Sequence, residues 1–330
     1  MTSPATIPTP RPDSVAQMLA NATSTLFSFE ILPPLRGKSI EGTYKSIDRL
    51  MEFAPAYVNI TTHRNEVVYV SAGEGIFRTV TTQRRPGSVA IAAAIRGRYG
   101  VRPVPHIICG EYSTQEIENQ LIDLAYLGIT DVLALRGDTG KGSKLFTTDA
   151  DGHLHAEGLC RQITDFNSGR MADGTVTDDV PVVPFTFGVA GYPEKHEEAM
   201  NRTADLEHLR AKVEAGAGYV VTQMFFDNSK YFRFVDECRA AGITVPIVPG
   251  LKPITSLKQM SLLPKTFHID LPEPLAREFV KCRDNDQAKA LGIEWTTAQA
   301  RELKAHGVPS IHFYSMNAAA SVAEIARKVY

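Results

Sequence analysis

Short apolar segments alternate with segments of helical periodicity along most of the chain, from residue 26 to residue 329. Eight of these segments are predicted strands, and the wholly apolar run at 132–135 is typical of a strand buried on both faces. The predicted strands span residues 26–32, 57–63, 102–109, 132–135, 185–192, 219–226, 246–254 and 310–317. Strict alternation of strands and helices favours an α/β fold, a single (β/α)8 TIM barrel. A doubly wound open sheet is the alternative, although no GxGxxG follows the first strand.

The predicted helices lie between these strands. They span residues 15–22, 39–53, 88–99, 114–127, 159–167, 203–215, 229–241 and 318–329, while residues 256–306 are helical in pieces broken near Pro264, Pro272 and Gly292. Residues 139–184 are rich in Gly, Asp and Thr and predict an irregular insertion after the fourth strand, exposed at 168–181. We therefore expect a flexible tail and short helix at 1–24 and one catalytic barrel domain at 25–330.

Composition excludes several classes of protein. The chain has 330 residues, is 43% hydrophobic and carries a net charge of −2, so a large core is expected and a nucleic-acid or membrane partner is not. Its four cysteines are far apart and form no CxxC pair, so we expect no disulfide framework and no metal site. The amino terminus has no apolar core typical of a signal peptide, and a cytoplasmic location is expected.

In a barrel, polar residues at the carboxyl ends of the strands are candidates for chemistry. Alternation along the first strand directs Ser28 and Glu30 into the barrel mouth, where loss of water would raise the pKa of a carboxyl group and make it an acid near neutral pH. Asp138 follows the fourth strand, and Gln223 lies in the sixth between Val221 and Phe225 on one face, where a buried amide must hydrogen-bond to something. The structural alternatives are a Glu30–arginine pair and a helix-capping role for Asp138.

Other polar residues end the remaining strands or follow them. These are Thr61, Thr62 and His63 at the end of the second strand, His106 in the third, Tyr192, Glu194, Lys195 and His196 at the end of the fifth, and His312, Tyr314 and Asn317 in the eighth. Asp205, His208 and Lys212 share one face of the helix at 203–215 because they are spaced three and four residues apart. A structural core histidine, a solvated loop and a surface helix face remain the alternatives for these groups. From the residues alone, the mouth suits a polar heteroaromatic ligand.

Seven sequence windows together resemble the methylenetetrahydrofolate reductase family. They are FSFEILPP at 27–34, PHIIC at 105–109, ALRGD at 134–138, GYPEKH at 191–196, TQMFFD at 222–227, PGLKPI at 249–254 and HFYSMN at 312–317. Their order and spacing resemble the short bacterial form of this family over residues 25–328. The resemblance implies a (β/α)8 barrel with non-covalent FAD, which reduces 5,10-methylenetetrahydrofolate to 5-methyltetrahydrofolate with NADH or NADPH, in ping-pong order, for methionine synthesis. It also implies a homo-oligomer.

The same resemblance implies roles for individual residues. Glu30 would be the acid that assists opening of the five-membered ring of the folate, Asp138 would hold the pterin edge and tune the flavin, and Gln223 would hydrogen-bond to the pterin. The residues implied in FAD binding are Thr61, His106, Arg136, Gly137, Asp138, Tyr192, His196, Asp205, His208 and Lys212.

The chain departs from the family pattern at three places. Ala318 replaces an arginine that binds substrate in relatives, Leu263 replaces a frequently aromatic residue, and the segment 168–181 is longer than the short form requires. These departures motivate a second hypothesis, in which a partner subunit or another carrier reduces the flavin. A third is a folate-binding barrel without turnover.

Overall fold

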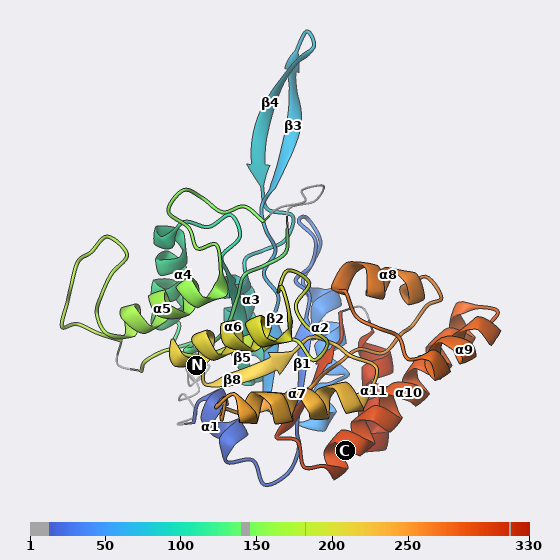
Figure 1. Ribbon diagram of the computed structural model, residues 1–330. Coiled ribbons are helices and arrows are strands. Elements are labelled where there is room, and N and C mark those ends of the chain that lie inside the picture. Colours follow the sequence, from blue (N-terminus) through green and yellow to red (C-terminus); the bar gives the residue numbers. More distant parts are fainter. Residues whose placement is uncertain (1–12, 140–145, 182, 317) are drawn as a thin grey trace, which may run out of the picture.

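The computed structural model describes residues 13–139, 146–181, 183–316 and 318–330, which form a ring of parallel strands surrounded by helices (Figure 1). The hydrogen-bonded order of the sheet is β10-β11-β1-β2-β5-β6-β7-β8-β9. The strands are β1 (Leu26–Ile31), β2 (Tyr57–Ile60), β5 (Arg102–Ile108), β6 (Asp131–Leu135), β7 (Thr186–Gly191), β8 (Tyr219–Thr222), β9 (Ile247–Val248), β10 (Gly250–Leu251) and β11 (Ser310–Tyr314).

The two ends of this sheet are consecutive in the chain. β9 pairs with β8 and β10 pairs with β11, so β9 and β10 are the halves of the predicted seventh strand. Pro249 separates them because a proline has no N–H for the ladder, and its carbonyl oxygen accepts a hydrogen bond from the His312 N–H at 2.9 Å. The sheet therefore nearly closes, the predicted barrel is confirmed, and the open-sheet alternative is wrong.

The helices follow the strands as the sequence predicts, with small shifts of their ends. They are α2 (Glu41–Asp48), η1 (Met51–Phe53), α3 (Ser88–Tyr99), α4 (Thr114–Tyr126), α5 (Ala156–Asn167), α6 (Arg202–Glu214), α7 (Asn228–Ala240), α8 (Gln259–Phe267), α9 (Glu273–Lys281), α10 (Asn285–Ala305) and α11 (Ala319–Val329). Ser113 caps α4: its hydroxyl oxygen accepts a hydrogen bond from the Glu116 N–H at 3.1 Å. None of the described helices is long and apolar enough to cross a membrane.

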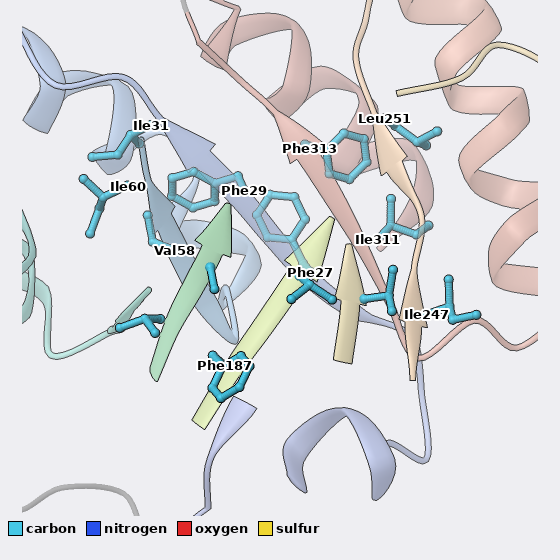
Figure 2. Packing of buried hydrophobic residues seen from close by; sticks show 14 of the residues in the cluster. Phe27, Phe29, Ile31, Val58, Ile60, Phe187, Ile247, Leu251, Ile311 and Phe313 are labelled. Carbon is cyan, nitrogen blue, oxygen red and sulfur yellow. The ribbon is translucent and has the colours of Figure 1, made fainter. Parts of the chain in front are cut away.

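The main hydrophobic core lies between the strands and the surrounding helices. Phe27 and Phe29 of β1 point into it beside Ile311 and Phe313 of β11 (Figure 2), and the Phe27 and Phe313 ring centroids are 5.6 Å apart. Since alternate residues of a strand face opposite sides, this packing directs Ser28 and Glu30 into the barrel, as predicted.

The short amino-terminal helix α1 (Val15–Ala20) covers the end of the barrel where the strands begin. Its Val15 N–H donates a 2.8 Å hydrogen bond to the buried Asp131 carboxylate, which also forms an ion pair with Arg102 and accepts a 2.7 Å hydrogen bond from Thr186. Val15 packs in a separate core cluster with side chains from inside the barrel. The helix thus belongs to the barrel, while the tail expected before it lies largely outside the described residues.

A two-stranded antiparallel hairpin, β3 (Glu66–Gly73) and β4 (Ile76–Thr82), was not predicted. It projects from the barrel between β2 and α3 (Figure 1) and exposes large apolar side chains, among them Tyr69 at 74% and Phe77 at 63%. Two strands bury too little surface to be stable alone. At the base of the hairpin, the N–H of Arg36, in the loop after β1, donates a 2.7 Å hydrogen bond to the Arg84 carbonyl oxygen and so ties the hairpin to the barrel.

The predicted insertion after the fourth strand is present between β6 and β7. Apart from α5, its described residues are irregular, with one isolated bridge between Arg170 and Val176. The Ala172 N–H donates a 2.6 Å hydrogen bond to Glu118 of α4. The largely exposed segment 168–181 is therefore anchored on the helix shell.

Two of the three predicted helix breaks are wrong. Pro272 immediately precedes α9, as expected, but Pro264 lies inside α8 and Gly292 lies inside α10. A Cβ atom at Gly292 would lie 1.9 Å from the Ile254 carbonyl oxygen. The glycine is therefore required for close packing of α10 against the end of the seventh strand, and it does not end the helix.

Gly292→Ala should lower the free energy of unfolding by about 1–3 kcal/mol, because the added methyl group forces the helix away from rigid backbone. Gly97→Ala is the matched control: Gly97 is also helical, and a Cβ there would meet nothing within 4 Å. That variant should be neutral or more stable by about 0.5–1 kcal/mol. Urea unfolding of both variants measures the difference, and equal effects would contradict the packing argument.

Candidate active site

Glu30 is the central ionisable residue at the carboxyl end of the barrel. It lies in β1, with Asn59 of β2 and Tyr314 of β11 as its neighbours in register, and only 6% of it is exposed. Burial raises the pKa of Glu30 to about 8, an effect that Lys252 opposes and Asp138 reinforces. A carboxyl group with this pKa keeps its proton at neutral pH and can act as a general acid.

His106 of β5 faces Glu30 across the barrel, with 3.8 Å between its Nε2 and the carboxyl Oε2. Burial lowers the pKa of His106 to about 3, with smaller effects from His312 and His63. The imidazole is therefore neutral at pH 7, and the contact with a protonated Glu30 is not an ion pair. Glu30 is thus an acid in the barrel mouth that does not transfer its proton to His106.

Several buried polar atoms beside Glu30 have no hydrogen-bond partner among the described residues. They are both amide atoms of Asn59, Oγ1 of Thr61 and Nε2 of His106. Buried polar groups are nearly always hydrogen-bonded in folded proteins, and unpaired ones need an explanation. A polar ligand in the mouth would supply these bonds, so the atoms fit a flavin or pterin edge.

The turn after β6 holds three predicted residues. Gly137 has a φ of +88°, which favours glycine. Asp138 is exposed, and its backbone carbonyl accepts a 3.0 Å hydrogen bond from Arg64. Arg136 binds Glu198 through both terminal nitrogens and lies over the Phe146 ring at 4.7 Å. The turn therefore brings charge to the mouth, but the Arg136 guanidinium is already engaged.

Gln223 and Tyr192 lie at the ends of β8 and β7. The Gln223 carboxamide oxygen accepts a 2.9 Å hydrogen bond from the N–H of Met224, and the residue lines a small cavity that Tyr192 also lines. Tyr192 makes an edge-on contact with His196, whose ring centroid is 4.7 Å away. These three residues form one side of the mouth.

The structure separates the three residues predicted on one face of α6. Asp205 accepts a 3.0 Å hydrogen bond from the His196 N–H, and Lys212 donates a 2.7 Å hydrogen bond to the Ala190 carbonyl of β7. His208 is exposed. Asp205 and Lys212 therefore face the barrel strands and their loops, while His208 faces solvent.

Some site residues were not identified from the sequence. Lys252, directly after β10, is only 5% exposed, and Asn59 is fully buried in β2. Both are polar residues near the carboxyl ends of strands, so the rule that selected Glu30 would also have selected them. Arg64 and Phe146 were likewise missed: Arg64 lies over the Phe146 ring at 5.3 Å and forms a 3.0 Å ion pair with Glu111.

The positions that depart from the family pattern lie in two places. Leu263 is 2% exposed and packs in a hydrophobic cluster with Met224 and Phe226. Ala318 directly precedes α11, close in sequence to the end of β11. Among the described residues, no group of three His, Cys, Asp or Glu side chains could hold a metal ion.

Comparisons with known proteins agree on one family. A family model described as methylenetetrahydrofolate reductase matches residues 15–329. The 5,10-methylenetetrahydrofolate reductase of Escherichia coli is 30% identical over 309 residues, which cover 93% of this chain and 92% of that protein. Methylenetetrahydrofolate reductase (NADH) 1 of Arabidopsis thaliana is 31% identical over 303 residues. They cover 89% of this chain but 46% of the plant protein, so the chain spans less than half of that relative.

A solved structure from Clostridium thermocellum has the same fold, with a TM-score of 0.55 and 16% identity. The alignment covers 95% of this chain and 97% of that one. That structure is of an uncharacterised protein that binds two copies of 5-methyl-5,6,7,8-tetrahydrofolic acid.

Glu30→Gln should raise the Tm at pH 9 and change it little at pH 5. The carboxyl has an ordinary pKa of 4.5 when unfolded and about 8 when folded, so the folded state binds the extra proton between these values. The free energy of unfolding of the wild type therefore falls as the pH rises from 4.5 to about 8. The uncharged amide of Glu30→Gln does not titrate, so at pH 9 the variant should regain at least about 1 kcal/mol of the lost stability. Thermal melts at both pH values measure the effect, with the exposed Glu294→Gln as control. Equal changes at pH 5 and pH 9 would contradict the raised pKa.

Proposed function

The chain belongs to the methylenetetrahydrofolate reductase family, and we propose that it reduces 5,10-methylenetetrahydrofolate to 5-methyltetrahydrofolate. The proposed cofactor is non-covalent FAD, and the proposed hydride donor is NADH or NADPH. The observation that best supports this proposal is the buried Glu30, protonated near neutral pH and surrounded by unpaired polar atoms at the mouth of the barrel.

The residues of the mouth fit FAD as a ligand. The unpaired atoms of Thr61 and His106 need hydrogen-bond partners, and Gly137 lets the backbone approach a ligand closely. Arg136 and Asp138 after β6, Tyr192 and His196 after β7, and Asp205 and Lys212 of α6 would complete the site. The family resemblance adds His208 of α6, which faces solvent. When bound, FAD supplies hydride transfer between the nicotinamide and the folate, while the protein orients the reactants and sets their electrostatics.

Glu30 has the clearest proposed chemical role. Its carboxyl proton would pass to the nitrogen that leaves when the five-membered ring of the folate opens, which gives the iminium that accepts hydride. Asp138 and Gln223 would hold the pterin by hydrogen bonds, since a carboxylate accepts bonds and a carboxamide both accepts and donates them. The NAD(P)H half-reaction requires no such proton, so only the folate half-reaction should depend on Glu30.

The family resemblance also supports three wider proposals: the chain acts as a homo-oligomer, works in the cytoplasm, and supplies methyl groups for methionine synthesis. The competing proposal, which the departure at Ala318 motivates, is that a partner subunit supplies the electrons.

Anaerobic stopped-flow absorbance should test the whole reaction. NADH or NADPH should bleach the flavin of the purified protein, and methylenetetrahydrofolate should then restore its absorbance. Flavin that neither nicotinamide bleaches would favour the partner subunit. A colourless protein that still binds folate would favour a barrel without turnover.

Glu30→Gln should leave the rate of flavin bleaching by NAD(P)H within about twofold of the wild type and slow the recovery with folate by about 10²–10⁴-fold, the usual contribution of a general acid. Both rates come from the same stopped-flow traces. The exposed Glu294→Gln is again the control and should change neither rate. Equal losses in the two half-reactions would rule out the acid role.

A further inference from the structure

Lys252 is a buried cation at the barrel mouth with poor hydrogen-bond acceptors. It follows β10, which pairs with β11 in register, so it is the neighbour of Tyr314 on one side, as Glu30 is on the other. Its Nζ lies 3.5 Å from the Tyr314 carbonyl oxygen and 3.3 Å from the Met316 sulfur. Among the described residues, no carboxylate oxygen lies within 4.0 Å of this nitrogen. Burying an ammonium group is costly unless it is paired and hydrogen-bonded. Burial lowers the pKa of Lys252, and a charged Glu30 nearby opposes that shift.

The groups around Glu30 leave Lys252 as its principal counter-charge. His106 of β5 and His312 of β11 are both neutral at pH 7, because burial lowers each pKa to about 3. The exposed Asp138 after β6 repels a Glu30 carboxylate, and Tyr314 of β11 stays protonated because burial raises its pKa. The pKa of His63, after β2, is also lowered, first by burial and then by Arg85. Lys252 therefore attracts the Glu30 carboxylate, whereas Asp138 repels it.

We infer that Lys252 is a positioning residue, whose ammonium group stabilises the carboxylate that Glu30 becomes when it gives up its proton. This inference rests on the proposed function for its catalytic meaning, but the coupling between the two side chains can be measured without turnover. The place of Lys252 in the reaction follows from burial, register and charge.

The chemistry of the proton transfer explains why such a cation matters. When the O–H bond of Glu30 breaks, the proton forms a bond to the leaving nitrogen of the folate, and the negative charge stays on the carboxylate. Because Glu30 is only 6% exposed, an uncompensated carboxylate there would make this step unfavourable. The Lys252 ammonium lowers that cost without itself losing a proton, and solvent later returns a proton to Glu30.

The alternative is that Lys252 only holds the turn after β11 through its contacts with Tyr314 and Met316. A purely structural lysine would affect stability and leave the protonation of Glu30 unchanged. The two roles are therefore distinguished by a titration of Glu30 itself.

The experiment is an infrared pH titration of the carboxyl C=O stretch of Glu30 in the folate-free protein, identified by its loss in Glu30→Gln. In Lys252→Met, which keeps the length of the side chain but removes the charge, the pKa of Glu30 should rise by at least about one pH unit. Lys252→Arg should stay near the wild-type value. Lys258→Met removes an exposed lysine at the start of α8 and should change nothing. Lys252→Gln replaces the Met variant if the latter does not fold.

The folate half-reaction provides the second readout. In Lys252→Met, the alkaline limit of its pH profile should move up with the pKa of Glu30, and the rate at pH 7 should fall at least about tenfold, because the proton is held more tightly. Flavin bleaching by NAD(P)H should be unchanged.

Two results would overturn the inference: an unchanged pKa of Glu30 in both Lys252→Met and Lys252→Gln, or an equal shift in Lys258→Met. Neither result touches the proposed function. The opposite combination is also informative. If the wild type does not reduce folate but the pKa of Glu30 still shifts in Lys252→Met, the coupling between Glu30 and Lys252 stands and the proposed function is rejected.

Discussion

Closure of the parallel sheet is the constraint on which the rest of the structure depends. β9 pairs with β8 and β10 pairs with β11, so the two halves of the seventh strand together bring the ends of the sheet to one segment of the chain and nearly close the ring. Closure also fixes which residues meet inside. It places Glu30 in register with Asn59 and Tyr314, and it carries Lys252 to the same level from a segment more than 200 residues away. The site is therefore a consequence of the strand register.

Each end of the barrel has a buried carboxyl group, Asp131 or Glu30, and the surroundings of the two groups differ. At the end where the strands begin, Asp131 receives an ion pair from Arg102 and hydrogen bonds from Val15 and Thr186, so its charge is matched by the protein. At the other end, Glu30 lies 3.8 Å from a neutral His106, and its pKa stays raised to about 8 because burial outweighs the attraction of Lys252. The first arrangement serves stability, because it ties α1 to the barrel. The second costs stability and leaves an acid ready for a substrate.

The strand order and the inward direction of Glu30 could be predicted from the sequence because both depend on local alternation of apolar residues. Other features depend on contacts between distant segments. Gly292 resembles a helix break in sequence, but the Ile254 carbonyl beside it is the reason for the glycine. Lys252 resembles an exposed lysine until closure of the barrel buries it. The hairpin was missed for a different reason: its alternating strands and the turn at Gly73 to Gly75 were readable, but they interrupt the regular alternation of strand and helix.

The unpaired atoms are unevenly distributed around the mouth, and this bears on how a ligand would bind. Beside Glu30, the amide of Asn59 and Nε2 of His106 have no partner among the described residues, so a polar ring can bond to them without displacing anything. On the side of β7 and α6, Arg136 already binds Glu198 and Lys212 already binds the Ala190 carbonyl. An anionic ligand group must exchange with those partners. Ring recognition is therefore built into the barrel, whereas the charged part of a ligand must compete with bonds that the protein has already made.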